Sequence, residues 1–199
     1  MATVSYGLKI TEAYHIFNKT IKIYRNAVHY ISGIAIRHYD ELKSLESITG
    51  DDGKVIISVQ QRRQQKMERL IHSTANNDAV YKRFDKEFYK FPSYLRRDAI
   101  NTSIGLILSY RSQLQKWEDG EKHGRKPYLN RNQNTMPCFY RNNTFLDSEE
   151  INIVSLKLYN GKDWIWETFV IHDCDFMYAY SHMKAWKASA PVLVKRNHR

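Results

Sequence analysis

Two arginines and an asparagine lie close together in one segment of the sequence and could bind nucleic acid. Arg96 and Arg97 are adjacent, and Asn101 lies four residues after Arg97, on the same face of a helix. A guanidinium group can bind phosphate or guanine through two hydrogen bonds, and a side-chain amide can bind adenine. We therefore predict that Arg96, Arg97 and Asn101 bind nucleic acid. The alternative is an ordinary solvated helix face.

A second set of basic residues could contact phosphate groups without reading the base sequence. Arg62, Arg63, Lys66 and Arg69 lie in one polar segment, while Lys116 and Lys126 flank a connector that contains further basic residues. Contacts of this kind weaken as the salt concentration rises. We predict that all six residues bind a nucleic-acid backbone. The alternatives are a solvated helix face for the first group and a flexible linker for the second.

Aromatic residues in the last third of the chain could stack on unpaired bases. On a strand, Phe139 and Arg141 would share one face and Tyr140 would take the other, so one set could stack while the other fills a core. Trp164 and Trp166 also share a face, and we expect at least one of them in the core. The predicted RNA-binding set is Tyr128, Phe139, Tyr140, Arg141 and Trp164.

The sequence contains no convincing catalytic or metal-binding pattern. No two of the eight histidines are separated by a single residue. Residues 172–175, His-Asp-Cys-Asp, have suitable atom types, but one short turn cannot direct them all inward. The two cysteines are far apart and give no disulfide framework. We expect no catalytic residue, no metal and no cofactor in this chain.

The overall composition is that of a basic globular protein. The chain has 199 residues, of which 42% are hydrophobic, and carries a formal net charge of +10. Such a charge favours polyanionic partners. No apolar run approaches the roughly 18 residues of a membrane span, and residues 1–10 do not resemble a signal peptide. We expect a cytoplasmic protein of one or two small units without a membrane partner.

The first two thirds of the chain have the periodicity of helices. Residues 4–10 alternate loosely and predict a strand. From Thr11 to Leu45, apolar residues recur every three or four positions, which predicts one long helix with a buried face. Residues 50–53 form a predicted turn, and further helices are expected at residues 57–72 and 78–89. A helix from about Tyr94 to Trp117, capped by Ser93, places a core-facing stripe along its length. The stripe consists of Leu95, Ala99 or Ile100, Ile104, Ile107, Leu114 and Trp117.

After Trp117 the composition changes, and glycine, proline and asparagine end the helical pattern. Beyond this boundary the period falls towards two, which predicts strands at residues 138–145, 151–159 and 164–172. Asn160 and Gly161 predict a type I′ hairpin turn between the last two strands. A helix at residues 173–186 and a strand at 191–195 complete the expected elements.

Residues 91–117 resemble a segment of the TnpB proteins of bacterial transposons, which are RNA-guided nucleases related to type V CRISPR effectors. The shared features are a Pro-Ser-x-x-Arg start, an Ala-Ile-Asn step and a Ser-Tyr-x-x-x-Leu end. Residues 126–127, 137–141, 164–166 and 186–193 are also similar. In that family the segment lies in the recognition lobe, so the resemblance implies that Arg96, Arg97 and Asn101 contact DNA.

The resemblance implies an α+β fold in which a helical recognition domain is inserted into an oligonucleotide-binding-like barrel, the wedge domain. The expected boundaries are residues 1–10 for the first wedge strand, 11–126 for the recognition domain and 127–199 for the rest of a barrel that is incomplete at its C-terminal end. The RuvC-like nuclease and zinc element of the family do not follow in this sequence. Magnesium and zinc are therefore expected only in that missing half, and we expect this chain alone not to be an enzyme.

The same resemblance implies that the partners are guide RNA and target DNA, together with a C-terminal nuclease half or a second copy of the chain. It also implies a location in the nucleoid region of a bacterial cytoplasm. Two other interpretations stay open. The chain could be a nuclease-free regulator or remnant derived from TnpB, or a basic RNA-binding protein unrelated to transposons.

Overall fold

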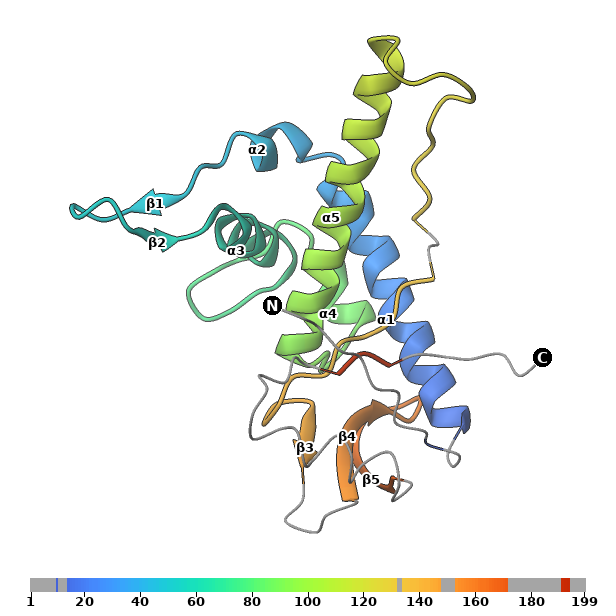
Figure 1. Cartoon of the computed structure of the whole chain (residues 1–199). Helices are drawn as coiled ribbons and strands as arrows, with labels where there is room; N and C mark the ends of the chain where they lie inside the picture. Colours follow the sequence, from blue (N-terminus) through green and yellow to red (C-terminus); the bar gives the residue numbers. More distant parts are fainter. Residues whose placement is uncertain (1–9, 11–13, 132–133, 148–152, 172–190, 194–199) are drawn as a thin grey trace, which may run out of the picture. The chain divides into compact units, whose positions relative to one another are not determined.

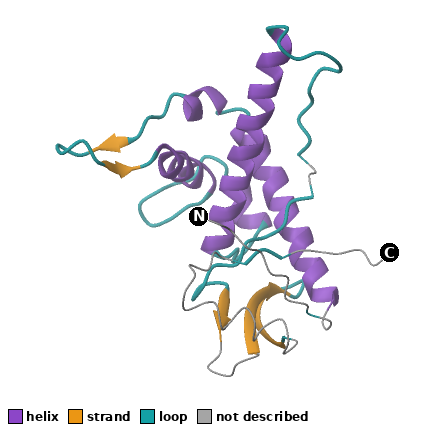
Figure 2. Cartoon of the chain, viewed as in Figure 1, coloured by secondary structure: helices purple, strands orange, loops and turns teal. Residues whose placement is uncertain are grey.

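The computed structural model describes residue 10 and residues 14–131, 134–147, 153–171 and 191–193 (Figure 1). The fold is α+β, and the described residues form five helices and two small antiparallel sheets (Figure 2). The chain divides into two compact units. One combines Met1–Lys22 with Met136–Arg199 and contains a three-stranded sheet, and the other, Ile23–Thr135, is mainly helical. We expected boundaries between the units after residues 10 and 126, and the structure places them after residues 22 and 135.

The long N-terminal helix that we predicted is divided in two. Helix α1 spans Tyr14–Ala35, and helix α2 spans Tyr39–Lys43. Between them, the amides of Arg37 and His38 both donate to the carbonyl of Ile34, at 3.0 and 3.2 Å, so the regular hydrogen-bond ladder ends there. The prediction of one continuous helix was therefore wrong. The predicted buried face is confirmed from Phe17 to Leu42, whereas Leu45 is only partly buried.

A small hairpin follows α2. Strand β1 (Ile48–Thr49) pairs with strand β2 (Val55–Ile57), and the predicted turn at residues 50–53 joins them. The amide of Gly50 donates to the carbonyl of Lys54 at 2.9 Å, and Gly53 takes a φ of 75°, which glycine adopts without steric cost. The turn was predicted, but the two short strands were not.

Helices α3 (Val59–Ile71) and α4 (Arg83–Glu87) correspond to the second and third predicted helices. At the start of α3, the amide of Gln61 donates to the hydroxyl of Ser58 while the Gln61 side chain accepts from the Ser58 amide. This reciprocal arrangement is a capping box. Helix α4 is shorter than the predicted span of residues 78–89, because residues 80–82 form turns before it and the amide of Tyr81 donates back to the carbonyl of Leu70.

Helix α5 spans Ser93–Glu118 and agrees closely with the prediction of residues 94–117. Its N-cap is Pro92, which makes no side-chain cap, so the predicted capping role of Ser93 was wrong. The core-facing stripe is confirmed from Leu95 to Leu114, and Trp117 is partly exposed. Helix α5 packs against the second part of α1, where the hydroxyl of Ser103 donates to the carbonyl of Val28 at 3.1 Å.

The other unit contains strands β3 (Phe145–Asp147), β4 (Ile153–Tyr159) and β5 (Trp164–Val170) in the order β3-β4-β5, all antiparallel. The last two predicted strands are confirmed apart from their ends. The predicted strand at residues 138–145 was largely wrong. Cys138 forms an isolated bridge with Val192, and the chain then turns at Asn142, which has a φ of 62°.

The hairpin between β4 and β5 is confirmed, but its turn type was wrong. Tyr159 pairs with Trp164, which leaves a four-residue loop, and the side chain of Asn160 accepts from the amides of Lys162 and Asp163. Gly161 has a positive φ of 109°, whereas Asn160 does not have the positive φ that a type I′ turn requires.

The core of this unit combines side chains that are distant in sequence. Ile16 and Phe17 from the first part of α1 pack with Phe139 and with the buried face of the sheet. That face consists of Val154, Leu156, Leu158, Phe169 and Ile171. Within the described residues the strands do not close into a barrel. The expected strand at residues 4–10, apart from Ile10, the helix at 173–186, the His-Asp-Cys-Asp segment and residues 194–195 lie outside the described residues.

Candidate nucleic-acid interface

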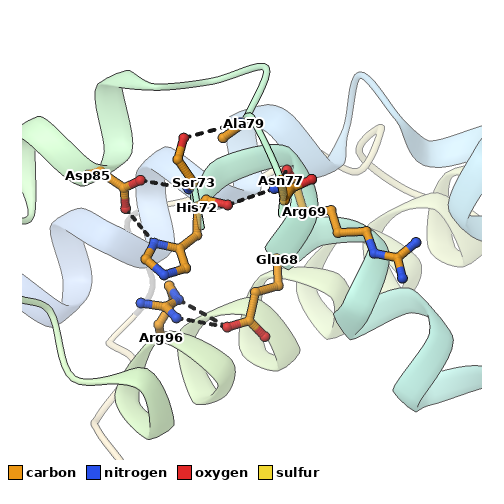
Figure 3. A network of polar contacts seen from close by, with 8 residues as sticks. All are labelled: Glu68, Arg69, His72, Ser73, Asn77, Ala79, Asp85 and Arg96. Atoms are coloured by element: carbon orange, nitrogen blue, oxygen red, sulfur yellow. Dashed lines mark hydrogen bonds and ion pairs between the residues drawn. The ribbon is translucent and has the colours of Figure 1, made fainter. Parts of the chain in front are cut away.

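Arg96 is held by a carboxylate within the protein. Its side chain is only 9% exposed, and its Nε and Nη2 atoms donate to Oε1 of Glu68 at 3.2 and 2.9 Å (Figure 3). A cation in the first turn of a helix is disfavoured by the helix dipole, and a bound anion would offset that effect. Glu68 supplies such an anion, so Arg96 is positioned to hold α5 against α3 rather than to face solvent.

The end of α3 is fixed by a polar network beside this ion pair (Figure 3). The carboxylate of Asp85 accepts from the amide of Ser73 at 2.9 Å and lies 2.7 Å from Nδ1 of His72. The Asn77 side chain donates to the carbonyls of Arg69 and His72. These contacts tie the C-terminal end of α3 to α4 and so restrain the helix that carries Glu68.

Arg97 and Asn101 remain accessible on α5. The side chain of Arg97 is 46% exposed, lies over the ring of Tyr94 at 5.3 Å and approaches Oε2 of Glu68 at 3.5 Å. The carbonyl of Asn101 accepts from Nε2 of Gln60 at 3.1 Å at the surface. Of the three predicted DNA-binding residues, Arg96 is therefore buried in an ion pair, whereas an external ligand could reach Arg97 and Asn101.

The four basic residues predicted on α3 also differ from one another. Arg62 and Arg63 donate to the carbonyls of Glu46 and Leu42, both at 2.8 Å, and so hold the segment that precedes the hairpin. Lys66 pairs with Glu41 at 2.7 Å.

The contacts around α3 lower the pKa of Glu41 and leave the side chain of Arg69 exposed. The hydrogen bonds from Lys66 and then from His38 hold the pKa of the Glu41 carboxyl below its usual value. The side chain of Arg69 is exposed and extends away from the network (Figure 3). Of the four, Arg69 is thus the residue most available to a phosphate.

The connector after α5 presents further basic and aromatic side chains. Lys116 is exposed, Lys126 lies over the ring of Trp117 at 5.4 Å, and Tyr128 is 79% exposed. The indole of Trp117 donates to the carbonyl of Gly124 at 3.0 Å, which fixes the turn in this segment. Lys116, Lys126 and Tyr128 are all accessible, as a binding role requires.

The aromatic residues of the sheet unit divide into core and surface. Phe139 is fully packed in the core and Trp164 is buried, whereas Tyr140 is partly exposed and Arg141 is exposed. The expectation that at least one of the two tryptophans belongs to the interior is confirmed. Stacking of a base on Phe139 would require the ring to leave the core.

Sequence reasoning left the exposed tryptophan, Trp166, out of the predicted RNA-binding set. Trp166 is 41% exposed and pairs across the sheet with Lys157, whose Nζ lies 5.7 Å from the centre of the indole ring. A ring beside a cation is a suitable surface for stacking a base. The sequence signal was available in principle, since Lys157 and Trp166 lie at matching distances from the Asn160–Asp163 loop.

No group of three or more histidine, cysteine, aspartate or glutamate side chains in the described part of the chain is arranged to hold a metal ion. Among the same residues, none of the helices has the length and apolar character needed to cross a bilayer.

The comparison with protein families gives a match over most of the chain. The sequence model of the Aq_aa04 family matches residues 2–160. The chain belongs to the Aq_aa04 family. The Aq_aa04 match includes all of the helical unit and extends through β4, and it ends before β5. No curated protein and no solved structure matches the chain.

Proposed function

We propose that this Aq_aa04 family chain is the wedge and recognition part of a TnpB-like system, which binds a guide RNA scaffold and the transposon-adjacent motif in DNA in the bacterial cytoplasm. The observation that carries the proposal is the order of the two units. A helical unit lies in the sequence between two segments of a sheet-containing unit, which is the order expected from the resemblance. In this proposal the three-stranded sheet is part of an oligonucleotide-binding-like wedge barrel.

Charge supports a nucleic-acid partner for the helical unit. Residues 23–135 contain 20 lysines and arginines against 13 aspartates and glutamates. Several of the cations, including Arg62, Arg63 and Arg96, are used inside the protein, but Arg69, Arg97 and Lys116 are exposed. The exposed cations would contact phosphates, and Arg97 with Asn101 would read bases.

The sheet unit supplies the second surface of the proposal. Trp166 with Lys157, and the exposed Arg141 beside Tyr140, would hold the RNA scaffold by stacking and phosphate contacts. Phe139 is buried in the core behind the sheet, and Trp164, on the same face as Trp166, is buried against Tyr159, so neither ring would touch RNA.

The proposal is tested by measuring the affinity of the protein, loaded with the RNA that copurifies with it, for a panel of short duplexes that differ at a few adjacent base pairs. We expect binding to weaken steeply with salt, because phosphate contacts release counterions. Arg97→Ala and Asn101→Ala should each reduce discrimination between duplexes by about 1 to 3 kcal/mol. Arg69→Ala should weaken all duplexes about equally.

Arg69 is the appropriate control because its side chain, unlike those of Arg62 and Arg63, is not used to hold a neighbouring segment. Affinity that is independent of salt would contradict a nucleic-acid partner. Retained RNA binding with no selectivity among duplexes would instead favour an RNA-binding protein without a DNA-reading role.

A further inference from the structure

A basic pocket opens on the helical unit between α1 and the segment that precedes α4. Its volume is about 520 Å³, within the range of sites that hold small organic ligands. One wall is formed by α1 at residues 29–34, and the other by residues 80–83. The charged residues that line it are all cationic: Arg37, Lys82, Arg83 and Arg131.

Two of these cations are already paired and two are not. Lys82 pairs with Asp78 at 2.8 Å, and Arg83 pairs with Glu87 at 3.0 Å. Arg37 and Arg131 have no ion-pair partner among the residues that the structure describes. The pocket therefore keeps a positive charge that no ion pair within the described part of the chain neutralises.

Tyr30 gives the pocket an aromatic wall. Its ring lies 6.0 Å from the rings of both Phe84 and Phe88, which hold it in place. Burial raises the pKa of the Tyr30 hydroxyl, Glu87 acts in the same direction, and Arg83 and Arg37 act against it. Both guanidinium groups therefore lie close enough to act electrostatically on this ring.

Gly33 allows Arg131 to approach the backbone of α1. A Cβ atom at residue 33 would lie 2.8 Å from Nη1 of Arg131, which is closer than real Cβ contacts. The segment that carries Arg131 is anchored further along by Arg25, which donates to the carbonyl of Thr135 at 3.0 Å. The missing side chain at Gly33 thus leaves the room in which the Arg131 guanidinium lies.

We propose that this pocket binds one nucleotide unit of a single-stranded RNA, with the phosphate held by Arg37 and Arg131 and the base placed against the tyrosine wall. Unpaired cations beside a fixed aromatic ring are the features by which proteins bind single strands. The pocket is open to solvent, which suits a strand that passes through it. This inference rests on the proposed function, because it names a site for the RNA that the chain is proposed to bind.

The test uses the full chain and a labelled 12-nucleotide uridine RNA, with binding followed by fluorescence anisotropy at several salt concentrations. Arg37→Gln combined with Arg131→Gln should weaken binding about tenfold and reduce the salt slope by about 1.4, since each phosphate contact on a single strand contributes about 0.7. The matched control is Lys43→Gln combined with Lys54→Gln, which removes the same charge from exposed positions outside the pocket. We expect the control to change affinity less than threefold, as charges far from the strand are screened.

Gly33→Ala tests the pocket without changing any charge. Alanine favours a helix over glycine, so this variant should melt at the same or a higher temperature. Its methyl group should displace the Arg131 side chain and weaken RNA binding. Weaker binding in a more stable protein cannot be explained by misfolding.

The outcomes separate the pocket from the proposed function. Equal losses in the pocket variant and the lysine control, with wild-type RNA binding intact, would overturn the pocket and leave the proposed function standing. A wild-type protein that does not bind RNA even at low salt would overturn both. If uridine monophosphate binds as tightly as the 12-nucleotide RNA, the pocket is a site for free nucleotides and the assignment to a strand is overturned. If inorganic phosphate alone binds as tightly as the RNA, the assignment to a strand is also overturned.

Discussion

Glu68 determines what the two adjacent arginines at the start of α5 can do. It holds Arg96 in a buried ion pair at 2.9 Å and makes a longer pair, at 3.5 Å, with the half-exposed Arg97, so neighbours in the sequence have different roles. Glu68 lies 28 positions before Arg96, and no local pattern indicates that the two meet. The helix and its arginines could be predicted from the sequence, but the burial of Arg96 could not, because it depends on a contact between separate helices.

Arg96→Ala should destabilise the protein by about 3 kcal/mol, because it leaves the partly buried Glu68 carboxylate without its main partner. Arg97→Ala, at a half-exposed position, should change the free energy of unfolding by less than about 1 kcal/mol. Urea unfolding of both variants measures the difference. Equal effects would mean that Glu68 does not distinguish the two arginines.

The two tryptophans of β5 provide a second contrast between neighbouring residues. Trp164→Ala should cost about 3 to 5 kcal/mol of stability because a buried ring is lost. Trp166→Ala should leave stability nearly unchanged and weaken RNA binding by about 1 to 3 kcal/mol. Thermal unfolding and RNA titration on the same samples test both statements. Unchanged RNA affinity in Trp166→Ala would remove this face of the sheet from the proposed interface.

Among the elements, those with strong periodicity were predicted well and those that depend on turns were not. Helix α5 and strands β4 and β5 follow their apolar patterns closely. The break between α1 and α2 occurs at Ile36, Arg37 and His38. None of these residues is a helix breaker, so the break could not be predicted from the sequence. The predicted strand at residues 138–145 failed because the chain turns at Asn142, where the amides of Asn143 and Thr144 both donate to the carbonyl of Tyr140 and close a local turn.

Helix capping offers a direct test at this scale, because Ser93, which was predicted to cap α5, does not do so, whereas Ser58 caps α3. Ser58 accepts a hydrogen bond from the amide of Gln61 at 3.2 Å, whereas Ser93 lies inside α5 after a proline cap. Ser58→Ala should therefore reduce the free energy of unfolding by about 1 kcal/mol. Ser93→Ala should change it by less than about 0.5 kcal/mol, as expected for a surface site. Denaturant unfolding measures both, and a larger effect for Ser93 would contradict the assigned caps.

At the scale of the molecule, the helical unit contains its own buried core. Apolar side chains from α1, α2, α3, α4 and α5 are buried within it, including Tyr24, Met67, Phe84 and Ile104. The order of helices and strands could be anticipated from the change in composition after Trp117, but the boundary within α1 could not, because that helix has one continuous apolar face. The first part of α1 belongs to the core of the sheet unit because Ile16 and Phe17 pack with residues that lie much later in the sequence.

A polypeptide of residues 14–135, which keeps α1 whole, should fold without the sheet unit. We expect cooperative thermal unfolding and the circular dichroism signal of the helices, because residues 23–135 form a compact unit with many buried apolar side chains. Non-cooperative melting would show that the sheet unit is required. The variant Leu95→Ala in the same polypeptide provides a control, since loss of a fully buried leucine should lower its stability by about 2 to 5 kcal/mol.

The long sequence separation within the sheet unit has a consequence during protein synthesis. Thr20 accepts a hydrogen bond from the amide of Tyr159, which lies 139 residues later. At an elongation rate of about 5 to 20 residues per second, Ile16 and Phe17 leave the ribosome roughly 7 to 28 seconds before their partners on β4. The helical unit emerges within that interval and can fold first. The apolar end of α1 is therefore a transient site at which a chaperone could bind the nascent chain.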